Sequence, residues 1–253
     1  LTKLGWSDVL LLEKEQLTSG TTWHAAGLIV SGLLDNETSA DIFTYSRNLY
    51  STLEEETGLA TGFKSIGYLQ IACDTERLEE MRRSAAFMRN FGIDCHEIGL
   101  EEARSHWPNA KWDDVIGAFY TAEDGRANPV DVTMSLAKGF RQRGGTLVEG
   151  VRVTDVLEQQ GQVAAVVTDH GTVETQFVVN CAGMWARQFG ELAGVSLPLQ
   201  AAEHYYLITE DMPGMTPTTP VLEDPDRYAY FREEVGGMMI GLFEPEAAPW
   251  NLD

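Results

Sequence analysis

The chain has 253 residues, 43% of them hydrophobic, and is long enough to bury a sizeable core as one large domain or two small ones. Its 39 acidic and 18 basic residues give a net charge of −21, which argues against binding to nucleic acid or a membrane surface, and no stretch approaches the roughly 18 apolar residues of a membrane span. Cys73, Cys95 and Cys181 are too widely spaced for a disulfide framework or a zinc site, so we expect reduced thiols and no metal.

The first half of the chain alternates strand-like and helical patterns. In chain order we expect a strand at 7–15, a Gly/Ser/Thr-rich loop at 18–28, a helix at 41–58, a strand at 66–72, a helix at 74–92 and a short helix at 100–108. The apolar core of the first strand, Val9 to Leu12, indicates a buried strand. Gly58 after the first helix and Asp74 before the second are typical cap residues.

The second half begins with a clear helix and then turns to strands. We expect a helix at 128–145, strands at 146–150, 151–159 and 162–169, an apolar strand followed by a helix within 176–194, and strands at 203–209, 228–233 and 236–244. Asn128 and Pro129 are a typical N-cap and first helical residue. Two separated blocks of helix-to-strand alternation, with strand-rich material between and after them, predict an α/β fold with a second domain woven in.

Glu13 ends the first strand, where a dinucleotide-binding unit places the acid that binds a ribose. Such a unit also needs a Gly-rich turn before that acid. No two glycines of this chain are separated by a single residue, so a GxGxxG motif is absent, and the 12 residues before Glu13 are too few for a strand, turn and helix. Two interpretations stay open at this point: a surface charge at a strand end, or a Gly-rich turn upstream of this sequence.

Glu13, Lys14 and residues 18–28, TSGTTWHAAGL, together resemble one family closely. They are similar to the amino-acid-oxidase-type flavoproteins of the dimethylglycine and sarcosine dehydrogenase group. The resemblance implies FAD as the cofactor, with Glu13 bound to its ribose and His24 bonded covalently to the flavin 8α-methyl group. The other residues that it assigns to the cofactor in this stretch are Lys14, Ser19, Thr21 and Thr22.

The chemistry of His24 agrees with this assignment. A neutral imidazole is a competent nucleophile toward an activated flavin methyl group, and the small residues Ala25, Ala26 and Gly27 let the ring approach closely. The alternative is a capping or core histidine, which is the usual role of a lone histidine. The match over residues 18–28 favours the flavin.

Two further segments resemble cofactor-contacting parts of the same family. In GVRVTDV, Val153 is implied to contact the adenine through its backbone. In VVNCAGMWA, Ala182 and Gly183 are implied to allow close backbone approach to the cofactor. Taken without the resemblance, these are an ordinary β-branched strand and an ordinary strand-to-helix turn.

The segments EHYYLIT and YAYFREEVGGMMIGLFEP resemble the family's substrate sheet over the flavin. The resemblance implies that His204 and Tyr230 contribute to the amine pocket as catalytic residues, with Tyr228 as a competitor for the second position. Arg232 has the planar guanidinium that binds carboxylates bidentately. Its alternative role is a solvent-facing strand charge paired with Glu234.

The resemblance divides the chain into two interwoven domains. Residues 1–65 and 130–198 are expected to form an incomplete Rossmann-like FAD-binding domain. Residues 66–129 and 199–253 are expected to form a truncated antiparallel-sheet substrate domain. We expect an internal fragment of a longer enzyme, without the N-terminal Gly-rich turn and without the C-terminal folate-binding domain that many members carry.

The implied reaction is flavin-dependent oxidation of an N-methylated amino acid of the dimethylglycine or sarcosine type, by hydride transfer from an N-methyl carbon to FAD. The one-carbon unit would pass to water, or to tetrahydrofolate if a folate domain follows. The electrons would pass to oxygen or to an electron-transfer flavoprotein. A bacterial cytoplasm and a mitochondrial matrix suit such an enzyme equally.

Two alternatives remain at the level of the sequence. One is a non-catalytic regulatory subunit that resembles the one associated with pyruvate dehydrogenase phosphatase. The other is an oxidoreductase of the same fold that acts on another amino or hydroxy acid, because one fold supports different pockets.

Overall fold

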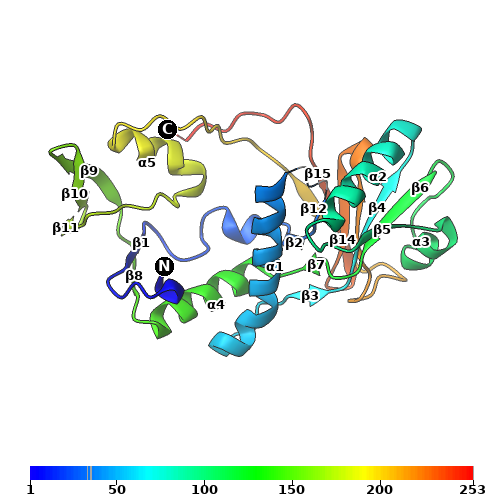
Figure 1. Ribbon diagram of the computed structural model, residues 1–253, viewed down its shortest axis with the longest axis horizontal. Coiled ribbons are helices and arrows are strands. Elements are labelled where there is room, and N and C mark those ends of the chain that lie inside the picture. The colour runs from blue at the N-terminus through cyan, green and yellow to red at the C-terminus, as the bar shows by residue number, and fades with distance from the viewer. Residues whose placement is uncertain (33, 35, 253) are drawn as a thin grey trace.

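The computed structural model describes residues 1–32, 34 and 36–252 (Figure 1). The helices are α1 (Glu37–Thr57), α2 (Thr75–Arg89), α3 (Leu100–His106), α4 (Pro129–Gln142) and α5 (Ala186–Leu192), with the short 3₁₀ helices η1 (Thr2–Leu4), η2 (Thr22–His24), η3 (Gly183–Trp185) and η4 (Pro225–Arg227). The strands are β1 (Leu10–Glu13), β2 (Leu28–Ile29), β3 (Lys64–Ser65), β4 (Tyr68–Ala72), β5 (Cys95–Ile98), β6 (Gly117–Thr121), β7 (Gly125–Arg126), β8 (Thr146–Glu149), β9 (Val153–Gln159), β10 (Gln162–Thr168), β11 (Gly171–Glu174), β12 (Tyr206–Ile208), β13 (Val221–Asp224), β14 (Ala229–Glu234) and β15 (Gly237–Leu242).

The largest sheet has seven strands in the order β12-β15-β14-β13-β4-β6-β5. Neighbours in it are antiparallel except β13 and β4, which run parallel. Smaller sheets are the parallel pair β1-β8, the meander β9-β10-β11 and the sheet β2-β7-β3. Figure 1 shows the large sheet at one end of the molecule and the meander with α5 at the other, with α1 and α4 between them. The expected mixture of helices and strands is therefore confirmed.

Local signals place the helix ends as expected. The side chain of Asp74 accepts a hydrogen bond from the Arg77 amide, and that of Asn128 accepts from the amides of Val130 and Asp131. Gly58 ends α1 in the left-handed conformation at φ 70°, where a residue without Cβ is favoured. These contacts satisfy amides and carbonyls that a helix leaves unpaired at its ends.

The core lies on both faces of the seven-stranded sheet. Leu69 and Ile71 of β4 join an apolar cluster with Trp107, which follows α3. Ala72, on the opposite face, joins a second cluster with Met81 of α2. All five residues of β4 are buried, so the alternating side chains of this one strand stabilise both layers.

Two strand expectations were wrong. The strand expected at 7–15 is limited to β1, and Leu10 and Leu11 are each 40% exposed because β8 is the only strand that pairs with β1 among the described residues. In the described residues no strand forms in the apolar segment before Gly183, where one was expected, and Phe177 and Val179 are exposed. An apolar segment becomes a strand only where a neighbouring strand accepts its backbone hydrogen bonds.

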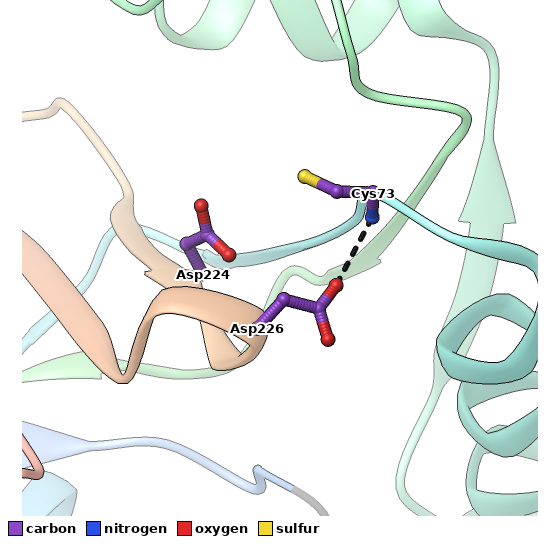
Figure 2. A group of neighbouring side chains, drawn as sticks. All are labelled: Cys73, Asp224 and Asp226. Carbon is purple, nitrogen blue, oxygen red and sulfur yellow. Dashed lines mark hydrogen bonds between the residues drawn. The ribbon is translucent and has the colours of Figure 1, made fainter.

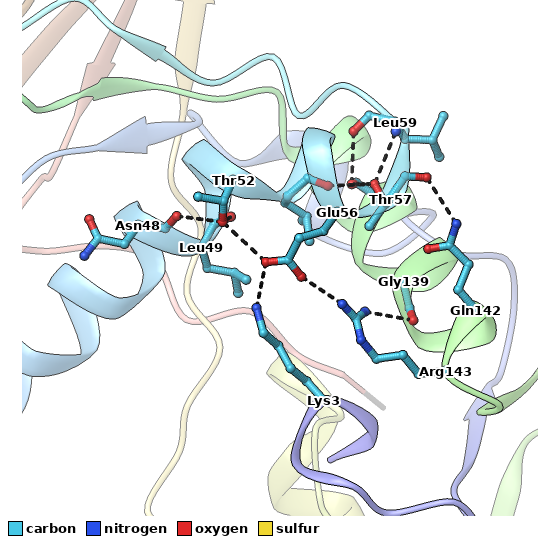
Figure 3. Close-up of polar contacts among 12 residues, drawn as sticks. Lys3, Asn48, Leu49, Thr52, Glu56, Thr57, Leu59, Gly139, Gln142 and Arg143 are labelled. Atoms are coloured by element: carbon cyan, nitrogen blue, oxygen red, sulfur yellow. Dashed lines mark hydrogen bonds and ion pairs between the residues drawn. The ribbon is translucent and has the colours of Figure 1, made fainter.

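Polar contacts hold the start of the chain against α1 and α4 (Figure 3). Glu56 near the end of α1 binds Lys3 through Oε1 and Arg143 through Oε2, each at 2.8 Å. The hydrogen bond from Lys3 is the main reason that the pKa of Glu56 is lowered. Gln142 in α4 also donates to the Thr57 carbonyl at 3.3 Å. These contacts tie η1, α1 and α4 into one unit beneath β1.

No helix in the described ranges is both long enough and apolar enough to cross a bilayer.

Candidate flavin and substrate site

The loop after β1 is closed by its own polar groups. The Ser19 hydroxyl donates to the Gln16 carbonyl at 2.8 Å and accepts from the Gln16 amide at 3.3 Å. The side chain of Ser19, expected to contact the cofactor, is therefore engaged in shaping the loop. None of the hydrogen bonds in the described part of the chain uses the amides of Gly20, Thr21 or Thr22. Successive free amides of this kind suit an anionic group such as a phosphate.

His24 ends η2 with its side chain exposed. Its ring lies 3.6 Å from that of Trp23, centroid to centroid, at an angle of 34°. The imidazole makes no hydrogen bond to another described side chain and caps no helix. The ring is exposed and packs on Trp23, so the roles of core histidine and capping histidine do not describe it.

The segment that follows His24 is held against the large sheet. Arg232 of β14 is 5% exposed and donates from Nε to the Ala26 carbonyl at 2.6 Å. It is also paired with Glu234, as expected, but it is buried, and the expectation of a solvent-facing charge was wrong. Gly27 has φ +70°, and a Cβ there would lie 2.2 Å from the Ala127 carbonyl oxygen. Only glycine permits this crossing of the two chain segments.

Lys14 and the turn at η3 come together although they are far apart in sequence. Lys14 Nζ lies 3.4 Å above the ring of Trp185, and Gly20 lies against the same ring. Gly183 has φ +56°, and a Cβ built there would meet no atom within 4 Å. The Ala182 amide donates to Asn180 Oδ1 at 3.2 Å, which leaves the turn open on the side of Gly183. The turn has room for the close backbone approach that the resemblance implies.

The expected ribose and adenine contacts lie near each other. Glu13 Oε1 accepts from the Glu15 amide at 2.9 Å, so one carboxylate oxygen is used locally. The Val151 amide donates to the Glu13 carbonyl at 3.0 Å, which places the start of β9 beside the end of β1. Val153 lies two residues further on and pairs with Thr168 in the meander.

A cavity of about 260 Å³ lies between α5 and the two segments around Leu199 and Trp250. Its walls include Arg187 and Gln188 at the start of α5. Within the described residues, Gln188 Oε1 is buried without a hydrogen-bond partner, and Arg187 Nε is buried with Glu191 Oε1 at the longer distance of 3.8 Å. The cavity is also lined by Met184 of η3, and its wall carries a polar atom that the described protein atoms do not satisfy.

The rings of the two expected catalytic residues, His204 and Tyr230, both lie near that of Phe243. The Phe243 ring centroid is 5.1 Å from that of Tyr230 and 6.4 Å from that of His204. Glu244 Oε2 lies 3.1 Å from His204 Nδ1, and the pKa of Glu244 is lowered by its own backbone amide and then by His204. The carboxylate can accept a hydrogen bond from Nδ1–H, and in that neutral tautomer Nε2 of His204 is the acceptor nitrogen. Sequence reasoning missed Glu244.

The structure separates Tyr230 from its competitor Tyr228. Tyr230 is 6% exposed and leans over Gly241, where a Cβ would collide with its phenol ring. Burial raises the pKa of its hydroxyl. Tyr228 is 49% exposed and ends η4 in the left-handed conformation. Tyr230 is the tyrosine on the sheet face that carries Arg232, since the two are two residues apart in one strand.

Three more polar residues on this face were missed by sequence reasoning, namely Glu223, Gln70 and Tyr68. The register of the large sheet places Glu223 opposite Tyr230 and beside Gln70. Tyr68 donates its hydroxyl proton to Glu223. The available signal was polar residues inside two short apolar stretches, YLQIA and VLED.

Cys73, Asp224 and Asp226 also gather where the central strands β4 and β13 end, with ligand atoms within 4.8 Å of one another (Figure 2). Both carboxylates already hold guanidinium groups. Arg227 Nη1 lies 2.6 Å from Asp224 Oδ2, and Arg77 Nε lies 2.8 Å from Asp226 Oδ1. Burial raises the pKa of the Cys73 thiol, which disfavours the thiolate that binds metals. The ion pairs with Arg77 and Arg227 describe this cluster as a structural contact.

Comparison with known proteins identifies the family. The family model described as FAD dependent oxidoreductase (DAO) matches residues 1–252. Mitochondrial sarcosine dehydrogenase of Mus musculus is 37% identical over 257 residues, which cover 99% of this chain and 28% of that protein. The mitochondrial pyruvate dehydrogenase phosphatase regulatory subunit of Mus musculus is 36% identical over 254 residues, which cover 98% of this chain and 29% of that protein.

The fold agrees with that assignment. The crystal structure of L-proline dehydrogenase from P. horikoshii superposes with a TM-score of 0.89 at 26% identity, covering all of this chain and 67% of that one. The chain spans less than a third of the two curated relatives named above. The resemblance stated from residues 13–28 and the mixed α/β fold are confirmed. The chain belongs to the FAD-dependent oxidoreductase (DAO) family.

Proposed function

We propose that the chain supplies part of the flavin and substrate site of an enzyme that oxidises an N-methylated amino acid, such as dimethylglycine or sarcosine. The observation that carries the proposal is the hydrogen bond from Arg232 Nε to the Ala26 carbonyl. It joins the segment that follows His24 to the sheet that presents Tyr230, so a flavin on that histidine would lie above this sheet.

The chain offers a set of groups that suits FAD. Glu13 would bind the ribose, while the free amides of the loop would face the pyrophosphate, where Lys14, Ser19, Thr21 and Thr22 lie. Val153 would contact the adenine, while Ala182 and Gly183 would allow close backbone approach. His24, with an exposed imidazole, would hold the flavin covalently. When bound, FAD supplies the two-electron acceptor that the side chains lack.

The residues of the chain would orient the amine and manage its proton. His204, with Nε2 free, would accept a hydrogen bond or a proton from the substrate nitrogen. Tyr230 would donate or accept a hydrogen bond from the neighbouring strand. Only the free base has the lone pair that stabilises the developing iminium, so proton removal must precede loss of the hydride.

The partners follow from the same proposal. The one-carbon unit would pass to water or to tetrahydrofolate, and the electrons to oxygen or to an electron-transfer flavoprotein. Bacterial cytoplasm and mitochondrial matrix remain the proposed locations. The division into residues 1–65 with 130–198 for the cofactor, and 66–129 with 199–253 for the substrate, also stays a proposal.

The test uses the protein expressed from its complete gene. The protein is denatured in acid and separated on a gel, and flavin fluorescence is measured in the polypeptide band, with a His24→Ala variant alongside. We expect fluorescence in the native sequence and none in the variant. Flavin that dissociates from both proteins would rule out the covalent role of His24. Absence of flavin from both would refute the proposed enzymatic function.

A non-catalytic regulatory role is the second candidate, favoured by the 36% identity to the phosphatase regulatory subunit. Flavin binding without reduction by any methylated amino acid would support it. An oxidoreductase for another amino or hydroxy acid is the third candidate. Reduction of the flavin under anaerobic conditions by such an acid, and not by dimethylglycine or sarcosine, would support that one.

A further inference from the structure

A partly buried carboxylate and a buried amide lie side by side on the sheet face that carries Tyr230. Glu223 of β13 is the register partner of Tyr230 on one side and of Gln70 on the other. Register partners extend to the same face of a sheet. Arg232 of this same face reaches the Ala26 carbonyl. The face therefore looks toward the loop that precedes β2.

Within the described residues, the Glu223 carboxylate has no basic partner and the Gln70 amide nitrogen has no hydrogen-bond acceptor. Glu223 accepts a hydrogen bond from the Tyr68 hydroxyl, and within the described ranges no ion pair joins it to a basic side chain. Burial raises its pKa from 4.5 to about 7. Gln70 is 2% exposed, and its Nε2 atom has no hydrogen-bond partner in the part of the chain that the structure describes. Such groups destabilise a fold unless something else satisfies them.

Other acids of this sheet region are paired. Glu97, in the same cross-strand row two strands beyond Gln70, is held by Arg82 at 2.9 Å from both carboxylate oxygens. Asp226 is held by Arg77. A Glu223 with a purely structural role would need no charge, because a neutral side chain accepts the hydrogen bond from the Tyr68 hydroxyl equally well. A cation supplied from outside the chain would offset the burial that disfavours the ionised form of Glu223.

We propose that Glu223 and Gln70 recognise the zwitterionic end of an amino-acid substrate. The Glu223 carboxylate attracts the substrate ammonium group, and Gln70 Nε2 donates to the substrate carboxylate. This inference rests on the proposed function and deepens it. It selects amino acids over hydroxy acids, since a hydroxy acid would leave the carboxylate of Glu223 without a cation.

The test compares two ligands of equal shape and different charge. Dimethylglycine carries a positive nitrogen, and 3-methylbutanoate has a CH group in its place. The holoenzyme from the complete gene is mixed with dimethylglycine without oxygen, and its dissociation constant is taken from the concentration dependence of flavin reduction. Binding of 3-methylbutanoate is measured by the change in flavin absorbance.

Glu223→Gln keeps the shape of the side chain and removes its charge. We expect Glu223→Gln to raise the dissociation constant of dimethylglycine by about tenfold and to change that of 3-methylbutanoate by less than about twofold. Gln70→Met should weaken both ligands, because both carry a carboxylate. Glu97→Gln, on the same row but already paired with Arg82, should alter neither.

Equal binding of dimethylglycine by the native protein and by Glu223→Gln would overturn the inference while leaving the proposed function intact. Equal weakening of both ligands in Glu223→Gln would also overturn it, because the effect would not depend on charge. A native flavin that responds to neither of these ligands, and is not reduced by sarcosine either, would refute the proposed function and the inference with it.

Discussion

Replacing Glu223 by glutamine is expected to leave stability unchanged below about pH 4.5 and to stabilise the protein increasingly as the pH rises from there to about 7. The substitution keeps an acceptor for the Tyr68 hydroxyl and removes the charge that burial disfavours. The neighbours Tyr230 and Gln70 keep their places because the two side chains have nearly the same volume.

The sign follows from the pKa. Burial raises the pKa of Glu223 from 4.5 to about 7, so the folded state favours the protonated acid. The stability associated with that proton is fully present below pH 4.5 and is lost as the pH rises through about 7. At roughly 1.4 kcal/mol per pKa unit, the ionised carboxylate costs about 3 kcal/mol well above pH 7. Glutamine avoids that cost, and for a chain of this size the gain corresponds to roughly 6–12 °C in Tm.

The assay is thermal unfolding of both proteins across a pH series, with no substrate added. The difference in Tm should be near zero below pH 4.5, grow between pH 4.5 and about 7, and level off at higher pH. Glu97→Gln is the matched control. The pKa of Glu97 is lowered by its hydrogen bond to Arg82, so its replacement should slightly destabilise the protein at high pH. A Tm difference for Glu223→Gln that does not vary with pH would refute the electrostatic reasoning.

Two further predictions concern the segment after His24. Gly27→Ala should destabilise the protein by about 2 kcal/mol or more in urea unfolding, because the new Cβ collides with the Ala127 carbonyl. Gly92→Ala is the control, since Gly92 also has a positive φ but has open space around it, and this substitution should cost about 1 kcal/mol. Equal losses of unfolding free energy in the two variants would contradict the proposed collision with the Ala127 carbonyl. Arg232→Met should lower the fraction of polypeptide that retains fluorescent flavin, because the Ala26 carbonyl loses its hydrogen-bond donor. A displacement of about 1 Å can slow a reaction by about a hundredfold. An undiminished fraction would show that this contact does not position the loop.

Local chemistry in the sequence determined the helices and the family. Asp74, Asn128 and Gly58 act within their own turns, so their capping roles depend on a few neighbouring residues and follow from the sequence alone. The loop at 18–28 carries its information in the same local way, and the family that it resembles is confirmed. The proposed roles of His24, His204 and Tyr230 rest on that resemblance and await their tests.

Only the tertiary structure decided which residues share the substrate face. The pairing of β13 with β14 and β4 brings together Gln70, Glu223 and Tyr230, which are separated by up to 160 positions in the sequence. Strand pairing of this kind depends on the backbone hydrogen bonds that distant segments exchange, and no local pattern encodes it. For the same reason the apolar segment before Gly183 looked like a strand and is not one, while the short acidic segment VLED lies at the centre of the sheet.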